Sequence, residues 1–318
     1  MVSVIIPAFR SAGYIAATVA SVFNQSYRDF EVIVVNDGSP DTPQLIDALA
    51  SRRDSVVYLE QENGGAGAAR NAGLARARGD LVAFLDADDR WLPHFLESQV
   101  AFLSAHPGRD MVYANARITG DTPLAGRTFM DTTPSEGPVS FQSLLLQQCT
   151  VITSSVVARR AAIEAVGGFD TSLRRGQDFD LWLRLAHGGA HIFYQREPLI
   201  ERIVLADGLS ADPITELKRA IGVLKGVHKK LALDPHDCTL LRRRITVLGS
   251  ALELERGKRC LRHGRFDEAR GHFQRSLALI PCWKVRLVLM LVSIAPRAFQ
   301  RAYVRLRPAT RSEILAAQ

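Results

Sequence analysis

Residues 81–89 read Leu-Val-Ala-Phe-Leu-Asp-Ala-Asp-Asp, a wholly apolar run that stops at a cluster of carboxylates. Such a run predicts a buried strand, which leaves the carboxylates at the mouth of the sheet. Asp86 and Asp88 repel each other there, and a divalent cation relieves that repulsion. Mg²⁺ or Mn²⁺ takes oxygen ligands from one or two carboxylates together with substrate phosphates. Taken alone, so short a pattern more often marks a solvated turn or a helix cap, and Asp89 could serve near the cap of the next helix.

Similar apolar runs alternate with helical patterns through the first half of the chain, which is typical of βαβ units in a mainly parallel α/β sheet. Strands are expected at residues 2–7, 31–36, 56–60, 81–86, 111–116 and 154–157. Helices are expected at residues 14–24, 43–51, 66–77, 93–105, 141–147, 160–166 and 177–187. Between residues 120 and 138, frequent Gly, Pro, Thr and Asp predict a loop over the sheet.

The ends of the first two predicted strands carry candidate ligand-binding residues, because ligands of open α/β sheets bind outside the carboxyl ends of the strands. Asp37 lies in Asn-Asp-Gly-Ser after the second strand, where a plain turn residue is the simpler interpretation. Its alternative role is to accept hydrogen bonds from the edge of a nucleobase. Phe9, after the first strand, would then offer an aromatic face close by.

A glycine-rich segment, Asn63-Gly-Gly-Ala-Gly-Ala-Ala-Arg-Asn71, follows the third predicted strand. It is not a dinucleotide-binding fingerprint, because Arg70 replaces the third glycine and the motif does not follow the first strand. The helix start after Gly65 could present backbone N–H groups to an anion, and Arg70 could add a charged fork for a diphosphate. Close helix–sheet packing is the alternative explanation of the small residues.

A second carboxylate pair, Asp178 and Asp180, begins the amphipathic helix predicted at residues 177–187. Negative side chains there offset the partial charge of the helix N-terminus, but that role does not need both residues. A carboxylate beside a substrate can also take a proton from an attacking hydroxyl, which contributes about 10²- to 10⁴-fold to a rate.

Residues 214–318 form a second region that is helical in pattern and lacks strands. Within it, the stretch from residue 251 resembles one tetratricopeptide-type hairpin, with Gly264 at the turn, Ala269 at the helix crossing and Pro281 closing the second helix. One such unit is too few for a solenoid. A helical cap is therefore expected in place of a peptide-binding array.

The net charge of +7 conceals an asymmetry between the two regions. Up to residue 214 there are 18 basic and 25 acidic residues, and beyond it 22 basic and 8 acidic ones. Two interpretations of the basic region are about equally supported. It contacts an anionic membrane surface, or it is a solvated basic face without a partner. Binding to nucleic acid is not expected, because the region lacks aromatic interleaving and a known module.

Targeting signals are not apparent in the sequence. No apolar run reaches the roughly 18 to 20 residues of a spanning helix, and the first residues do not resemble a signal peptide. The four cysteines, without a C-x-x-C pair, indicate neither a zinc site nor a disulfide framework. A cytoplasmic protein is expected, peripheral at the inner face of the membrane if the basic region contacts lipid.

Six motifs, each weak alone, follow one another in the order seen in glycosyltransferase family 2, the large inverting group with the GT-A fold. The chain resembles this family over about residues 2–202. The motifs are Val4-Ile-Ile-Pro-Ala-Phe9, Val34-Val-Asn-Asp-Gly-Ser39, Asn63-Gly-Gly-Ala-Gly-Ala-Ala-Arg-Asn-Ala-Gly73, Phe84-Leu-Asp-Ala-Asp-Asp89, Gly167-Gly-Phe-Asp170 and Gln177-Asp-Phe-Asp-Leu-Trp-Leu-Arg184.

The resemblance implies a GT-A nucleotide-diphospho-sugar transferase domain at residues 1–213, with the all-helical region at 214–318 as an extension. It implies a nucleotide site in which Pro7, Ala8 and Phe9 line the base pocket. Asp37 would bind the edge of the base, and Arg70 would lie near the nucleotide.

The resemblance also implies a metal and a base. Asp88 would be the principal ligand of Mn²⁺ or Mg²⁺, with Asp86 supporting the ribose or the metal shell, and Asp178 would be the general base. The family commonly has Glu-Asp where this chain has Gln177-Asp178. Activity is still expected because the aspartate is kept, but any tuning or acceptor contact made by the glutamate is left open.

The implied reaction is a single displacement that moves a sugar from a nucleotide diphosphate, by default UDP, to an acceptor hydroxyl with inversion. The implied acceptor is a cell-surface polysaccharide or lipid-linked glycan. A degenerate transferase that serves as a membrane- or partner-binding scaffold is the alternative, and the joint presence of Asp88 and Asp178 argues against it. A nucleotide-sugar pyrophosphorylase is disfavoured, because no Gly-rich loop with a following Lys comes after the first strand.

Overall fold

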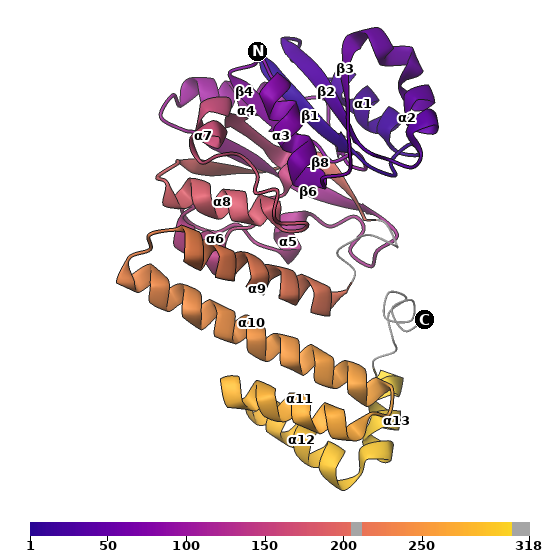
Figure 1. Cartoon of the computed structure of the whole chain (residues 1–318), viewed down its shortest axis with the longest axis vertical. Coiled ribbons are helices and arrows are strands. Elements are labelled where there is room, and N and C mark those ends of the chain that lie inside the picture. The colour runs from indigo at the N-terminus through magenta and orange to yellow at the C-terminus, as the bar shows by residue number, and fades with distance from the viewer. Residues whose placement is uncertain (205–211, 307–318) are drawn as a thin grey trace. The chain divides into compact units, whose positions relative to one another are not determined.

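The chain divides into two compact units, Met1–Leu205 and Ala206–Gln318, and each is described by itself (Figure 1). The computed structural model describes residues 1–204 and 212–306. The sequence predicts the division a few residues later, between residues 213 and 214.

One mixed sheet forms the centre of the first unit. Among the described residues it has eight strands, in the order β3-β2-β1-β4-β7-β6-β8-β5. The strands are β1 (Val2–Ala8), β2 (Phe30–Asp37), β3 (Val56–Gln61), β4 (Leu81–Phe84), β5 (Arg90–Trp91), β6 (Met111–Gly120), β7 (Val156–Arg159) and β8 (Ile192–Val204). The pairings among β3, β2, β1 and β4 are parallel, β7 runs antiparallel to both of its neighbours, and β8 is parallel to β6 but antiparallel to β5.

Helices cover both faces of this sheet. They are α1 (Ile15–Phe23), α2 (Thr42–Leu49), α3 (Ala66–Arg76), α4 (Phe95–Ala105), α5 (Phe129–Thr132), α6 (Phe141–Leu145), α7 (Arg160–Ala165) and α8 (Gln177–His187), with two 3-10 turns, η1 (Ala50–Ser55) and η2 (Thr153–Ser155). Figure 1 shows α3 and α8 on one face of the sheet. Successive strand residues point to opposite faces, so the side chains of β1 pack against helices on both faces of the sheet.

The packing of β1 shows how the layers are filled. Val4 and Ile6 join the main apolar cluster with Val19 and Phe95 of α1 and α4. Ile5 points the other way, toward α3, where a Cβ on Gly73 would lie 2.4 Å from the Ile5 Cγ2 atom. Close helix–sheet packing, the alternative reading of the small residues, therefore holds at Gly73.

The structure corrects several secondary-structure expectations. The long strand β8 and the short β5 were not predicted, and the predicted loop begins at the last residue of β6, Gly120, and contains α5. Ser154 lies in η2 and not in a strand, and β4 ends at Phe84. Asp89 does not cap α4, whose N-cap is His94.

The second unit consists of helices within its described residues. They are α9 (Pro213–Lys230), α10 (Pro235–Arg262), α11 (Phe266–Leu279), α12 (Trp283–Ile294) and α13 (Pro296–Leu306). Gly264 turns the chain between α10 and α11 with a φ of 72°, and Ala269 is fully buried. The two helices approach closely, because a Cβ on Gly257 would lie 2.5 Å from the Phe273 ring.

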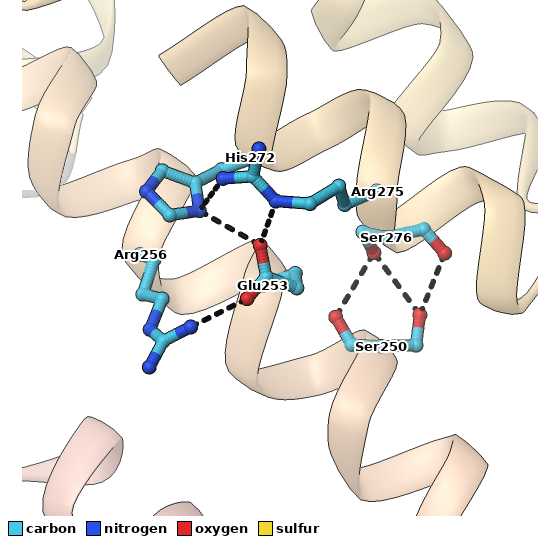
Figure 2. A network of polar contacts seen from close by, with 6 residues as sticks. All are labelled: Ser250, Glu253, Arg256, His272, Arg275 and Ser276. Atoms are coloured by element: carbon cyan, nitrogen blue, oxygen red, sulfur yellow. Dashed lines mark hydrogen bonds and ion pairs between the residues drawn. The ribbon is translucent and has the colours of Figure 1, made fainter. Parts of the chain in front are cut away.

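A polar network joins α10 to α11 (Figure 2). Glu253 accepts hydrogen bonds from Arg256 at 2.6 Å and Arg275 at 2.7 Å, and it contacts the His272 ring at 2.8 Å. Burial opposes ionisation, but these hydrogen bonds outweigh it and lower the pKa of Glu253 to about 2. Beside this network, Ser250 of α10 and Ser276 of α11 also meet, and their hydroxyl oxygens lie 3.0 Å apart.

Candidate active site

The carboxylates after β4 begin with Asp86, which is paired with Arg70. The Arg70 Nη2 atom donates to Asp86 Oδ1 at 2.6 Å, and the Arg70 side chain is only 6% exposed. Its guanidinium also lies over the Phe169 ring, 5.3 Å from the centroid. The structure thus brings Arg70 and Asp86, both predicted site residues, into direct contact at the carboxyl end of the sheet.

Asp88 lies two residues further on and is half-buried. Burial and the Asp86 charge raise its pKa, while the Arg202 guanidinium opposes that rise. Such a carboxylate fits a divalent cation, because the cation removes the repulsion that raises the pKa. No group of three or more His, Cys, Asp or Glu side chains within residues 1–204 and 212–306 could hold a metal unaided. The residues therefore fit a cation whose shell is completed by phosphates and water, as is usual for Mg²⁺.

Asp89 is a further residue of the candidate site, which the sequence predicted only as a helix-cap residue. It is 5% exposed, and its carboxylate accepts hydrogen bonds from Ser154 Oγ at 2.6 Å and from the Ile203 N–H at 3.0 Å. Burial, followed by the charges of Asp86 and Asp88, raises its pKa to about 7 against the effect of these bonds. Asp89 therefore ties the loop to η2 and to the end of β8.

The turn η2 joins the two groups of carboxylates. The Thr153 hydroxyl lies 3.3 Å from Asp178 Oδ2 and donates to it, and the Ser154 hydroxyl accepts from the Asp86 N–H at 3.1 Å. Because Thr153 and Ser154 are consecutive, Asp178 and the loop of residues 86–89 lie at the same end of the sheet. The Thr-Ser-Ser run before an apolar strand is the only sequence signal that could have pointed to this turn.

The two carboxylates of α8 differ in role. Asp178 is half-buried beside Thr153, and its Oδ1 also accepts from the Phe179 N–H at 2.8 Å. Asp180 is fully buried and bound to Arg184 at 2.7 Å. Arg184 in turn donates to the carbonyl oxygen of Gly168 at 2.7 Å. Asp180 is thus bound within α8, whereas Asp178 contacts η2, so the two carboxylates have different surroundings.

The helices α3 and α8 meet at a glycine. A Cβ on Gly67 would lie 3.1 Å from Gln177 Cγ, so this crossing favours a residue without a side chain. Gln177 is 7% exposed, and its Oε1 atom has no hydrogen-bond partner in the described part of the chain. Asn71 fastens the neighbouring loop, since its side chain exchanges two hydrogen bonds with the Phe169 backbone at 2.8 and 2.9 Å.

Asp37 lies at the end of β2 and holds the glycine-rich segment. Its carboxylate accepts hydrogen bonds from the Gly64 and Gly65 N–H groups, both at 2.8 Å, and from Gln61 at 2.7 Å. It is 3% exposed. The Gly65 amide is thus engaged by Asp37, and Gly65 adopts a φ of 87° that favours glycine. The contact of Asp37 with a base edge stays a prediction.

The residues after β1 lie beside Asp37, because Ala8 is the register partner of Asn36. Pro7 and Ala8 belong to β1, whereas Phe9 is 45% exposed after it. The Arg10 guanidinium lies 5.5 Å from the Phe9 ring centroid. An exposed aromatic ring at this edge can stack on a flat apolar ligand.

The geometry is accompanied by a likeness to known proteins. A family model described as Glycosyl transferase family 2 matches residues 3–167, which is just over half of the 318 residues. This chain belongs to glycosyltransferase family 2. It is a glycosyltransferase, and the resemblance inferred from the six motifs is confirmed.

Related glycosyltransferases are about 30% identical to this one. The amylovoran biosynthesis glycosyltransferase AmsB of Erwinia amylovora is 32% identical over 210 residues, covering 62% of this chain and 67% of that protein. The UDP-Glc:alpha-D-GlcNAc-diphosphoundecaprenol beta-1,3-glucosyltransferase WfaP of Escherichia coli is 30% identical over 238 residues, covering 71% of this chain and 86% of WfaP.

Solved structures share the fold at low identity. TarS 1-349 of S. aureus in complex with UDP-GlcNAc has a TM-score of 0.62 at 18% identity, covering 95% of this chain and 90% of that one. The mannosyltransferase PcManGT of Pyrobaculum calidifontis in complex with GDP-Man and Mn²⁺ has a TM-score of 0.64 at 18% identity, covering 99% and 85%. The predicted GT-A fold with a C-terminal helical region is thereby confirmed.

Proposed function

We propose that this glycosyltransferase moves a sugar from UDP to a hydroxyl of a lipid-linked saccharide, with inversion at the anomeric carbon. The observation that carries the proposal is the turn η2, whose consecutive residues Thr153 and Ser154 bind Asp178 and the loop of residues 86–89. A UDP donor and a lipid-linked acceptor are supported by WfaP, whose name specifies both.

We assign the nucleotide to the edge formed by the ends of β1, β2 and β4. The exposed Phe9 ring would stack on the base, with Pro7 and Ala8 behind it. Asp37 would act chiefly by fixing Gly64 and Gly65, with which it is hydrogen bonded, beneath the nucleotide. Arg70 would hold the Asp86 carboxylate in place through its ion pair.

Asp88 would hold Mn²⁺ or Mg²⁺ as principal ligand, with Asp86 in support. When bound, such a cation supplies Lewis-acid neutralisation of the charge on a departing diphosphate. PcManGT was solved with Mn²⁺, which supports divalent metal use in this fold. Arg202, whose charge acts on Asp88, would add a second positive group near the diphosphate.

Asp178 would accept the proton of the acceptor hydroxyl while the hydroxyl oxygen attacks the anomeric carbon. Attack opposite the leaving diphosphate is a single displacement and gives inversion. No covalent glycosyl-enzyme is required, unlike in retaining glycosidases with two close carboxylates.

Two substitutions separate donor binding from chemistry. Asp88→Asn should abolish thermal stabilisation by UDP with Mn²⁺, which at 100 times the dissociation constant is worth about 2.7 kcal/mol. Asp178→Asn should keep that stabilisation and lower the release of UDP from UDP-glucose in the presence of Mn²⁺ by about 10²-fold or more. The exposed Asp47 supplies a matched control, and Asp47→Asn should change neither quantity.

Wild-type stabilisation by UDP in Asp88→Asn would refute the metal assignment, and unchanged turnover in Asp178→Asn would refute the base assignment. GDP, CDP and ADP should stabilise less than UDP under the same conditions. A larger effect of GDP would overturn the choice of base.

A further inference from the structure

The helix α12 carries a row of exposed apolar side chains along one side. Trp283 is 70% exposed, Leu287 44%, Met290 49% and Ile294 74%. Their spacing of four, three and four residues places all four on one face of a helix. We call this row the apolar stripe.

The apolar stripe lies opposite the face by which α12 packs. Val285 and Val292 are buried in the core of the second unit, together with Leu261 and Phe273. The helix is therefore held in place by one side while the other side presents large apolar groups to solvent. A contiguous apolar surface of this kind on a protein marks an interaction site more often than chance.

Basic side chains accompany the apolar stripe. Residues 283–306 contain Lys284, Arg286, Arg297, Arg301 and Arg305 and no acidic residue. The three arginines of α13 are exposed and four residues apart, so they share one side of that helix, while Phe299 and Tyr303 pack against the core. Within residues 1–204 and 212–306, none of these five cations forms an ion pair.

We propose that α12 and α13 dock on the surface of an anionic phospholipid bilayer, with the apolar stripe inserted among the headgroups and the basic residues facing lipid phosphates. An interfacial helix combines an apolar face that includes Trp with Lys and Arg beside it. The inference is independent of the reaction proposed above, although a lipid-linked acceptor would be met at the same surface.

Charge favours a bilayer over a second copy of the chain. A second copy would bring five more cations and no compensating carboxylate to the interface, whereas anionic lipid attracts each basic residue. The twelve residues of α12 correspond to about 18 Å of helix, too short to span a bilayer. No helix in the described part of the chain has the length and apolarity needed to cross a membrane.

Vesicle flotation of the full chain tests the docking surface. Vesicles of phosphatidylglycerol and phosphatidylcholine should carry at least ten times more protein than vesicles of phosphatidylcholine alone. Binding should weaken in high salt, because the charge contribution is screened. Trp283 provides an internal probe, since Trp91 and Trp182 are 3% and 2% exposed, so vesicle binding should shift Trp283 emission to the blue.

Two variants test the apolar and the basic parts of the docking surface separately. Leu287→Gln with Met290→Gln should lower vesicle binding roughly tenfold, and Arg297→Gln with Arg301→Gln and Arg305→Gln should do so at least as strongly. The matched control, Lys229→Gln with Arg242→Gln and Arg243→Gln, removes three exposed cations from α9 and α10 and should bind vesicles almost as wild type. Circular dichroism verifies that each variant keeps its helices.

Three results would overturn the proposal. They are equal binding to neutral and anionic vesicles, an equal loss in the matched control, and a dimer on size exclusion that the Leu287 and Met290 changes dissociate. The last outcome would assign the apolar stripe to a second copy. Failure of UDP binding leaves these measurements unaffected, so the two proposals fail separately.

Discussion

Asp89 in the first unit and Glu253 in the second both accept hydrogen bonds from their surroundings, but their pKa values are shifted in opposite directions. Burial and the charges of Asp86 and Asp88 raise the pKa of Asp89 to about 7. At Glu253, burial acts the same way but is outweighed by hydrogen bonds from Arg275, His272 and Arg256, so the pKa is about 2. The charge of the neighbouring groups therefore decides whether the pKa is raised or lowered.

The difference teaches how each unit uses its acidic residues. In the first unit, like charges are gathered at one edge of the sheet, an arrangement that costs stability unless a cation joins them. In the second unit, a carboxylate is surrounded by basic groups and fastens two helices. Repulsion from neighbouring carboxylates therefore distinguishes Asp88 and Asp89 from the neutralised Glu253, even though Asp86 beside them is paired with Arg70.

The largest effect is expected at Asp180, which belongs to the first unit but is neutralised like Glu253. Asp180→Ala should lower the free energy of unfolding by about 3–5 kcal/mol, because it leaves the Arg184 charge enclosed without its partner. Urea denaturation, followed by emission of the buried Trp91 and Trp182, measures the change. A loss below about 1 kcal/mol, equal to that of an exposed control such as Asp47→Ala, would contradict the structural role.

An intermediate effect is expected at Asp89. Asp89→Ala should lower the rate of sugar transfer by about 10²-fold, because Ser154 and the Ile203 N–H lose their acceptor and the loop of residues 86–89 loosens. The specificity constant for the donor measures it. Ser154→Ala should act in the same direction, and wild-type rates in both variants would show that this connection does not position the loop.

The smallest effect is expected at Glu253. Glu253→Gln should destabilise the contact between α10 and α11 by about 1–2 kcal/mol and leave transfer unchanged. Hydrogen exchange of the amides in α10 and α11 should become roughly tenfold faster. The exposed Glu268 provides the control, because its pairing with Arg265 is solvated and should contribute little.

The Glu253 contribution should depend on pH in a defined window. The folded-state pKa is lowered, so the stabilisation is present above the unfolded value of about 4.3. It should be lost as pH falls from there through about 2. If wild type and Glu253→Gln kept the same stability difference down to pH 2, the ion network would not be its source.

Much of the fold is predictable because the strands β1 to β4 are short apolar runs with turn residues after them. The strand β8 escapes the same analysis, since it contains Gln195, Arg196, Glu197 and Pro198 and pairs with β6 through register shifts. Its apolar period is broken where the ladder is irregular. A local pattern cannot reveal a strand that is defined by its partner.

The candidate site is predictable at the level of its motifs but not of its contacts. Asp86, Asp88 and Asp178 stand out by position, whereas the pairing of Arg70 with Asp86 and the role of Ser154 depend on segments far apart in the chain. Asp37 likewise binds Gly64 and Gly65, which no spacing shows. The general base, the metal ligands, the nucleotide contacts and the cytoplasmic location stay predictions.

The turn η2 has a mechanical consequence. One peptide unit, with about 3.8 Å between its Cα atoms, separates the residue that grips the helix bearing Asp178 from the residue that grips the loop after β4. Covalent geometry sets this spacing. A displacement of the turn therefore carries both contacts along together, and the spacing between Asp178 and the loop of residues 86–89 should change little.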